Sequence, residues 1–223
     1  MPSLGISLAF ALLLVVLIPA AESAQKDGLA ARVAQLEAQV AAMEEILQFV
    51  YVEEEEINGV AGPHWIIEGA NVHVRSGSGE TSDGCPSIPP EPGLCQSLTG
   101  LGNLIVGYNE RRGKSSGPVR VGSHNLIVGD QHAYWSFGGF VAGAGNSVTG
   151  PVASVCGGVS NWASGLASSV CGGEGNQAIG VKSSVSGGQG NEAIGDNSSV
   201  SGGQFRNAEN DFNWAAGSLF EEN

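Results

Sequence analysis

The chain contains little positive charge and little proline. Its 223 residues include nine lysines and arginines against 22 aspartates and glutamates, which gives a formal net charge of −13. Nucleic acids and anionic membrane surfaces are therefore excluded as expected partners, because they attract basic proteins. Glycine is abundant at 35 residues, but only nine prolines and no three-residue period accompany it, which excludes a collagen-like fold.

Long apolar runs are missing beyond the first 24 residues. The segment LAFALLLVVLIPA is shorter than a membrane-spanning helix, and small residues follow it. This pattern predicts a signal peptide over residues 1–24, with cleavage near Ser23 or Ala24. The leading MPSLGIS has no basic residue, so an uncleaved anchor is the alternative. We expect a secreted or cell-surface protein with no stable membrane insertion after signal removal.

Cysteine is also scarce, with four residues that an exported protein can use for disulfides. Cys85 and Cys95 bracket the segment PSIPPEPGL, and a disulfide between them would close this loop. Cys156 and Cys171 lie fifteen residues apart at equivalent positions of a repeat. Stacked repeats would bring them within disulfide range, so a disulfide and a pair of buried free thiols are the two alternatives.

A heptad pattern follows the signal segment. Apolar residues alternate four and three apart in LAARVAQLEAQVAAMEEILQFV. The a positions are Val33, Val40 and Leu47, and the d positions are Leu29, Leu36, Met43 and Val50. The pattern predicts a coiled-coil oligomerisation helix over residues 25–52, with three heptads spanning roughly 33 Å. The alternative is a helix packed on its own domain, but the apolar stripe is too narrow for a globular face.

Residues 53–101 are expected to connect the helix to the rest of the chain. The glutamate run in YVEEEEING is interpreted as a solvated collar that ends the helix before an Asn-Gly turn. HWIIEGANVHVRSG alternates apolar and polar residues, which predicts a strand over residues 65–74. The polar segment that follows, with Cys85 and Cys95, is expected to be a loop of about 20 residues.

One unit repeats between residues 102 and 204. Asparagines open the segments NSVTG, NWASG, NQAIG and NEAIG, and valines of a second element keep the same spacing of fifteen. The repeated residues are Asn146, Asn161, Asn176 and Asn191 with Val155, Val170, Val185 and Val200. Two short β-like runs per unit predict an all-β fold, a parallel β-roll or β-solenoid with 15-residue coils. Each asparagine amide is expected to bond the asparagines above and below it.

Two earlier segments, GNLIVG and HNLIVG, are interpreted as earlier copies of the NQAIG element, 22 residues apart. The extra length predicts an insertion at residues 108–120 that loops off the stack. Its basic residues are Arg111, Arg112, Lys114 and Arg120. Loops on a rigid scaffold frequently carry function, so this is a candidate contact loop, and a solvated loop without a partner is the alternative.

A narrow coil needs small inward side chains. Ala163, Ala178 and Ala193 form one expected inward column, whereas Ile179 and Ile194 point outward. The outward apolar column needs a cover, which other copies of the chain can supply. After Gln204 the pattern fails and aromatic residues appear, so residues 205–223 are interpreted as a C-terminal cap, with an aromatic binding surface as the alternative.

Units such as NQAIGVKSSVSGG and NEAIGDNSSVSGG resemble the YadA-like head repeats of trimeric autotransporter adhesins. The resemblance covers roughly residues 103–204 and implies a β-roll in which three chains pack side by side, commonly joined to a trimeric coiled coil. This chain departs from that family, because its period is fifteen rather than fourteen and its coiled coil precedes the head. The resemblance is limited to head and coiled coil, so self-transport and outer-membrane anchoring are not implied.

Candidate chemistry in the sequence is sparse. GGEGNQAIG matches the glycines of a calcium-binding nonapeptide, but Gln177 and Glu192 stand where that motif has aspartate. The four histidines show no metal-ligand spacing, and no catalytic set stands out, so we expect no cofactor, no metal and no enzymatic activity. The sequence predicts a homotrimeric fibre subunit or adhesin head, able to form filaments and to bind a host-surface or matrix ligand. The alternative is a carbohydrate-active enzyme or sugar-binding protein on a monomeric β-helix.

Overall fold

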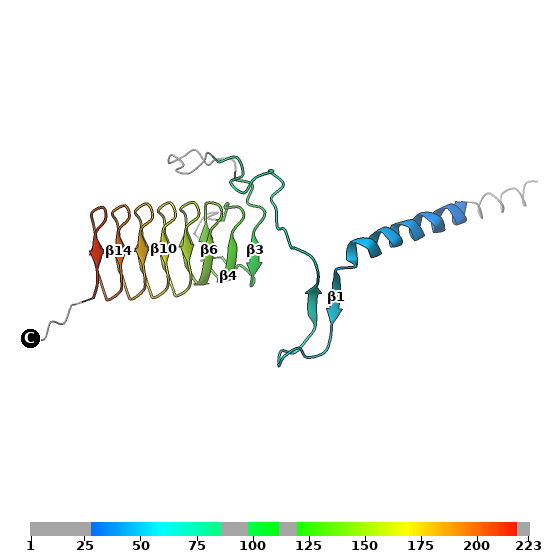
Figure 1. Cartoon of the computed structure of the whole chain (residues 1–223), viewed down its shortest axis with the longest axis horizontal. Helices are drawn as coiled ribbons and strands as arrows, with labels where there is room; N and C mark the ends of the chain where they lie inside the picture. Colours follow the sequence, from blue (N-terminus) through cyan, green and yellow to red (C-terminus); the bar gives the residue numbers. More distant parts are fainter. Residues whose placement is uncertain (1–27, 86–97, 112–119, 218–223) are drawn as a thin grey trace, which may run out of the picture. The chain divides into compact units, whose positions relative to one another are not determined.

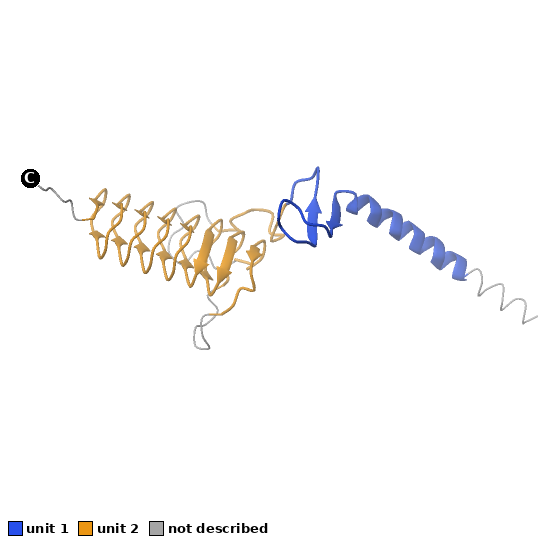
Figure 2. Cartoon of the chain, turned by 90° about the horizontal axis from the view of Figure 1, so that it is seen from below, with its two compact units in different colours: residues 1–72 blue, residues 73–223 orange. Residues whose placement is uncertain are grey.

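The computed structural model describes residues 28–85, 98–111 and 120–217. The chain divides into two compact units, residues 1–72 and residues 73–223, which Figure 2 shows in different colours. The predicted signal peptide lies outside the described residues. The first unit contains the helix and the second contains the repeats.

The first unit contains a helix and a small hairpin. The helix covers residues 28–47 of the described chain. β1 (Val50–Glu53) pairs antiparallel with β2 (His64–Ile67). Between them, Ile57 and Val60 exchange two backbone hydrogen bonds of 3.0 Å around Asn58 and Gly59. Both central residues have positive φ, 52° and 85°, as a two-residue hairpin turn requires and as Asn-Gly readily adopts.

Two predicted boundaries in this unit differ from the structure. The expected helix over residues 25–52 ends at residue 47, and Val50, the last residue of the predicted seam, starts β1 opposite Ile67. Val-Tyr-Val is a sequence of β-branched and aromatic residues that prefers a strand, and β2 offers it a partner. The predicted strand over residues 65–74 ends at Ile67, because Gly69 takes a φ of 72° and turns the chain.

The second unit is a parallel β-solenoid, as predicted (Figure 1). Its first sheet has eight strands, ordered β16-β14-β12-β10-β8-β6-β4-β3, and its second has six, ordered β15-β13-β11-β9-β7-β5. The first sheet comprises β3 (Leu104–Val106), β4 (Leu126–Asp130), β6 (Phe140–Ala144), β8 (Ser154–Val155), β10 (Ser169–Val170), β12 (Ser184–Val185), β14 (Ser199–Val200) and β16 (Trp214–Ala215). The second comprises β5 (Ala133–Tyr134), β7 (Ser147–Val148), β9 (Trp162–Ala163), β11 (Gln177–Ala178), β13 (Glu192–Ala193) and β15 (Asn207–Ala208).

The strand register gives the length of each coil. Ser154 pairs with Ser169, and Ser169 pairs with Ser184, so these coils have the predicted fifteen residues. Nearer the start, Leu126 pairs with Phe140, and Phe140 pairs with Ser154, which makes these coils fourteen residues long. Leu104 pairs with Leu126, so the first coil has 22 residues, two coils of fourteen follow it, and the stack then continues with the fifteen-residue repeat.

The core is a double column of inward side chains. The first sheet contributes Ile127, Val141, Val155, Val170, Val185 and Val200, and the second contributes Tyr134, Val148, Ala163, Ala178, Ala193 and Ala208. Valine on one sheet faces alanine on the other through most of the stack, which fills a narrow interior at close-packed density. The predicted inward alanine column and outward Ile179 and Ile194 are confirmed by their burial.

Two predictions about the ends of the stack were wrong. β3 and β4 lie in the first sheet with the SVC and SVS strands, not in line with the NQAIG strands. Ile105 pairs with Ile127, which pairs with Val141, and Val141 pairs with Val155. These isoleucines therefore belong to the same column as the inward valines of the first sheet, not to the alanine column of the second. After Gln204 the repeat does not fail, because β15 and β16 add a further coil paired with β13 and β14.

Candidate functional site

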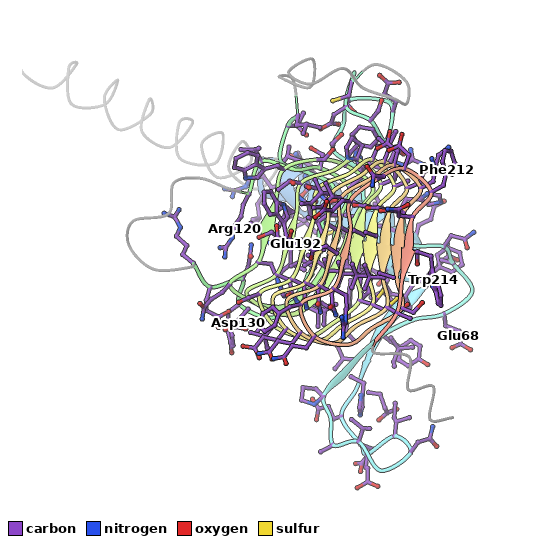
Figure 3. All side chains as sticks on the ribbon, turned by 90° about the vertical axis from the view of Figure 1, so that its left-hand side faces the viewer. Glu68, Arg120, Asp130, Glu192, Phe212 and Trp214 are labelled. Atoms are coloured by element: carbon purple, nitrogen blue, oxygen red, sulfur yellow. The ribbon has the colours of Figure 1, made fainter. Side chains whose placement is uncertain are left out.

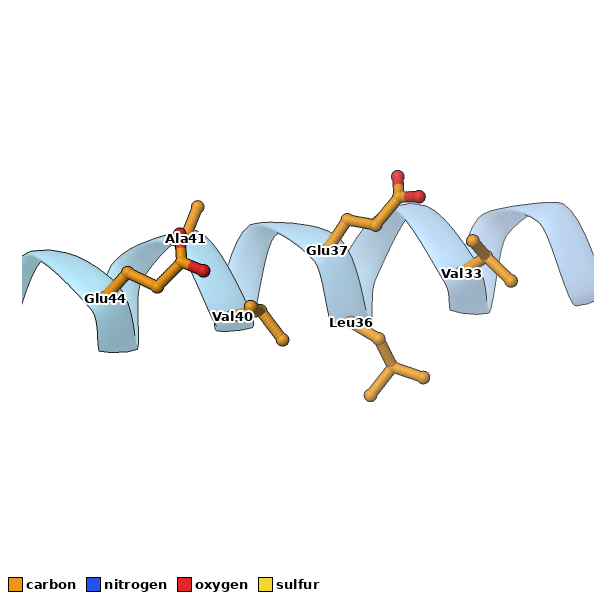
Figure 4. A pocket seen from close by; sticks show the side chains of 6 residues that line it. All are labelled: Val33, Leu36, Glu37, Val40, Ala41 and Glu44. Atoms are coloured by element: carbon orange, nitrogen blue, oxygen red, sulfur yellow. The ribbon is translucent and has the colours of Figure 1, made fainter.

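The helix presents its heptad seam to solvent. Leu29, Leu36 and Met43 are 63%, 57% and 57% exposed. Val33, Leu36, Val40 and Ala41 line a shallow apolar groove along the helix that Glu37 and Glu44 border (Figure 4). No helix in the described part of the chain is long and apolar enough to span a membrane. The exposed apolar groove is a candidate site of self-association.

Burial of this seam would stabilise the helix by much more free energy than its own backbone hydrogen bonds do. An isolated helix of about 20 residues is marginal in water, because nucleation offsets most of the gain from its hydrogen bonds. Complete burial of a valine, leucine or methionine side chain contributes about 1.5–3 kcal/mol. Six of the predicted seam residues lie on the helix: Leu29, Val33, Leu36, Val40, Met43 and Leu47. Their joint burial against other chains would supply the stability that the single helix lacks.

The repeated asparagines form a buried column inside the solenoid. Asn176 is fully buried, and its Oδ1 accepts a hydrogen bond of 2.9 Å from the backbone N of Asn191 in the next coil. Its Nδ2 donates to the carbonyls of Gly172 and Gly188, both at 2.9 Å. The predicted link between successive asparagines is therefore present, and it joins each side-chain oxygen to the backbone N of the next asparagine rather than to its side chain. Each asparagine saturates the backbone groups of two coils at a corner where water cannot reach.

His132 occupies the first position of this column. The backbone N of Asn146 donates to its Nδ1 at 3.2 Å, and its Nε2 lies 3.0 Å from the carbonyl of Val128, four residues earlier. Asn161 makes the equivalent bond to Gly157, also four residues earlier, at 3.1 Å. The imidazole therefore substitutes for an asparagine amide, with Nδ1 as acceptor and Nε2–H as donor. Burial lowers the pKa of His132 below its usual value, because the desolvation of an imidazolium outweighs the opposing effects of the Val128 carbonyl and of the Asp130 charge.

Stability is expected to fall as the pH decreases below about 6.5, the usual histidine pKa. His132 stays neutral in the folded chain but is protonated in the unfolded chain, so acid favours unfolding, with a slope of up to about 1.4 kcal/mol per pH unit. Urea unfolding at a series of pH values measures this slope. His132→Asn restores the side chain of the following coils and should flatten the dependence, and an unchanged slope in this variant would contradict the assignment.

A buried carboxylate closes the first end of the solenoid, and no pattern in the sequence predicted it. Asp83 accepts hydrogen bonds from Ser76 Oγ at 2.5 Å and from Thr99 N and Oγ1 at 2.8 and 2.5 Å. Ser76 N donates to His124 Nε2 at 3.1 Å, and Ser123 Oγ accepts from the backbone N of Gly100 at 3.0 Å. Burial alone would raise the pKa of Asp83, but the surrounding hydroxyl donors outweigh it and hold that pKa well below its usual range.

The four cysteines divide into two environments. Cys85 is buried and disulfide-bonded, while Cys95, its predicted partner, lies outside the described residues. Cys156 and Cys171 are free thiols, the second of the two alternatives. They are exposed rather than buried, because each follows an inward valine and points to the outer face of the first sheet.

The outer face of the first sheet carries no charge in its two columns of side chains. One column is Leu104, Leu126, Phe140, Ser154, Ser169, Ser184, Ser199 and Trp214. The other is Val106, Val128, Ala142, Cys156, Cys171, Ser186 and Ser201. The face changes from apolar residues near β3 to small hydroxyl and thiol residues further along the stack. Figure 3 shows Trp214 on this side and Glu192, from the second sheet, on the opposite side.

The outer face of the second sheet is more mixed. Trp162, Ile179 and Ile194 are exposed, and Glu192 stands among them. The indole N of Trp162 donates to Thr149 Oγ1 in the preceding coil at 2.9 Å, which holds the ring along the stack. The outward apolar residues that the sequence analysis expected other chains to cover lie on this face. Their burial by other chains stays a prediction.

Arg120 of the predicted contact loop uses its guanidinium for hydrogen bonds within the chain. Its Nε donates to the carbonyl of His132 at 2.9 Å, and its Nη1 donates to the carbonyl of Asn109 at 2.6 Å. Its Nη2 donates to the carbonyl of Glu110. Asn109 Nδ2 in turn donates to Tyr134 Oη at 2.9 Å. Arg120 therefore fastens the insertion to the first coils, and of the other predicted loop residues Arg111 is exposed, whereas Arg112 and Lys114 lie outside the described residues.

The last coil of the stack carries three exposed aromatic side chains. Phe205, Phe212 and Trp214 are 70%, 78% and 64% exposed. The indole N of Trp214 donates to Ser201 Oγ of the preceding coil at 2.7 Å. Phe220 lies outside the described residues. These rings continue outward columns of the repeat, so both the cap and the aromatic contact surface stay predictions.

The described residues contain no group of three or more histidine, cysteine, aspartate or glutamate side chains arranged to hold a metal ion. The chain was compared with protein-family models, with curated proteins and with solved structures, and none of them matches it. Functional inference therefore rests on the seam, the columns and the faces described above.

Proposed function

We propose that the chain is a secreted homotrimeric structural or adhesive surface protein without catalytic activity. The observation that carries the proposal is the exposed heptad seam of the helix, with Leu36 and Val40 at its centre. A seam of this periodicity is stabilised by packing against identical seams. The solenoid then serves as a rigid head whose two outer faces are available for contact with other chains or with a surface ligand.

The resemblance to YadA-like head repeats supports three chains rather than two. That family has a fourteen-residue unit, and the spacing from Leu126 to Phe140 and from Phe140 to Ser154 agrees with it. The seam alone favours a parallel dimer, because β-branched valine at a and leucine at d prefer two strands. The three-chain proposal therefore depends on the head repeats, while self-association itself depends on the helix.

The mass of the secreted protein in solution tests both parts. We expect light scattering coupled to size exclusion to give three times the mass of one chain. A mass of two chains would overturn the trimer but retain self-association through the seam. A monomer would overturn the proposal as a whole, and masses that grow with concentration would indicate a fibre subunit rather than a discrete head.

A further inference from the structure

Cys156 and Cys171 form a pair of thiols on adjacent coils. Each backbone N donates to the next coil, Cys156 to the carbonyl of Val170 and Cys171 to the carbonyl of Val185, both at 2.9 Å. The two residues are consecutive members of one outward column, so their Cα atoms are separated by one strand spacing, about 4.8 Å. Both thiols are free and exposed.

The surroundings of the pair are neutral. Ala142 precedes it in the column, Ser186 follows it, and the flanking column contributes Ser154 and Ser169. Burial and the neighbouring Cys171 thiol raise the pKa of Cys156. A protonated thiol is a poor nucleophile, so exchange with external disulfides is slow at this site. No carboxylate in the two columns competes as a ligand for hard cations.

Geometry favours a shared metal ion over a disulfide. Side chains of in-register neighbours on parallel strands point the same way, which keeps their Cβ atoms about 4.8 Å apart, outside the 3.5–4.5 Å that a relaxed disulfide needs. A tetrahedral ion bound at about 2.3 Å to two thiolates holds the sulfur atoms about 3.8 Å apart. Rotation about χ1 can bring two sulfur atoms to this separation without moving the backbone of either coil.

We propose that Cys156 and Cys171 bind a soft, thiophilic divalent metal ion as a two-thiolate chelate. Each thiol releases its proton as its sulfur–metal bond forms, so one ion displaces two protons and the remaining coordination positions are filled by water. Thiolate ligands select soft ions over calcium and magnesium. The site is independent of the proposed self-association, because it is complete within one chain.

Titration of the full-length protein with Cd²⁺ tests the site. We expect a thiolate-to-cadmium charge-transfer absorption that saturates at one ion per chain, and no response to Mg²⁺. Cys156→Ser and Cys171→Ser should each abolish the absorption. Serine already occupies this column at Ser186 and Ser201, so both variants keep a side chain that the fold accepts. Ser186→Cys adds a third thiol one coil further and should tighten Cd²⁺ binding at least tenfold.

Three outcomes would overturn the proposal. The first is the absence of the absorption from the unmodified protein. The second is a charge-transfer absorption in both serine variants that equals that of the unmodified protein, which would place the ion elsewhere. The third is a disulfide between Cys156 and Cys171 in protein purified without reductant, detected by peptide mass mapping as the loss of two hydrogens. Retained circular dichroism in the serine variants ensures that a lost signal reports lost ligands rather than lost fold.

Discussion

Replacing Leu36 by aspartate is expected to reduce the assembled protein to single chains. Leu36 lies at the centre of the seam and is 57% exposed in the single chain, so the proposed assembly would bury it. Its burial contributes about 1.5–3 kcal/mol in each chain. An aspartate there loses this contribution and also places a charge against apolar side chains, which is strongly unfavourable. Because the change is present in every chain of the assembly, its cost is multiplied by the number of chains.

Ala38→Asp provides the matched control for this experiment. Ala38 occupies the f position of the same heptad, away from the seam, so the variant carries the same charge and a similar loss of helix propensity. Light scattering should give a threefold lower mass for Leu36→Asp and an unchanged mass for Ala38→Asp. Equal masses for the two variants would show that the seam does not hold the chains together, provided that the solenoid in both unfolds at the same temperature.

Replacing Gly165 by alanine is expected to destabilise the solenoid by about 3 kcal/mol or more, as overpacking against a rigid backbone does at the upper end of its range. A Cβ at this position would lie 1.9 Å from the carbonyl O of Gly180 in the next coil. Gly150, Gly180 and Gly195 show the same approach to backbone atoms of the following coil at 2.2, 2.0 and 2.1 Å. The clash is therefore with a column of backbone, which can yield only if the coils move apart and their hydrogen bonds lengthen.

Gly172→Ala is the control, because a Cβ there meets nothing within 4 Å and its φ is not positive. This variant should be neutral or slightly stabilising, since alanine restricts the unfolded chain more than glycine does. Urea or thermal unfolding of the two variants, followed by circular dichroism, measures the difference. Similar stabilities would mean that the coils tolerate a wider spacing than the structure shows.

The solenoid was predictable from the sequence because its period is strict. The recurrence of Asn176 and Val185 every fifteen residues gives the coil length, and the small size of Ala178 identifies the inward side. The seam was equally readable, because a four-three spacing of apolar residues has few structural interpretations. Both patterns are repeated along the chain, so several residues that are each weakly informative predict the same structure.

Features that occur once were missed or misplaced. His132 occupies an asparagine position, where its imidazole offers the same donor and acceptor as an amide. The sequence does not show this equivalence, because histidine breaks the asparagine repeat. Asp83 reaches Thr99 from sixteen positions away, so no local pattern connects them. Val50 fits both the heptad spacing of a helix and the residue preference of a strand, and its pairing with Ile67 places it in a strand. In each case a contact distant in sequence determined the structure.

Arg206 occupies the position that follows the last asparagine of the buried column. It stands fifteen residues after Asn191, and its backbone N donates to Asn191 Oδ1 at 2.8 Å as each earlier member of the column does. An arginine side chain carries donors and no acceptor, so it cannot receive the backbone N–H of a further coil in the way Asn191 receives its own. Each asparagine side chain thus offers an acceptor to the backbone of the next coil, and among the described residues this series of acceptors ends at Asn191. A second copy stacked on this coil would meet no asparagine acceptor, so we expect head-to-tail stacking at this end to be less favourable than assembly through the helix or the side faces.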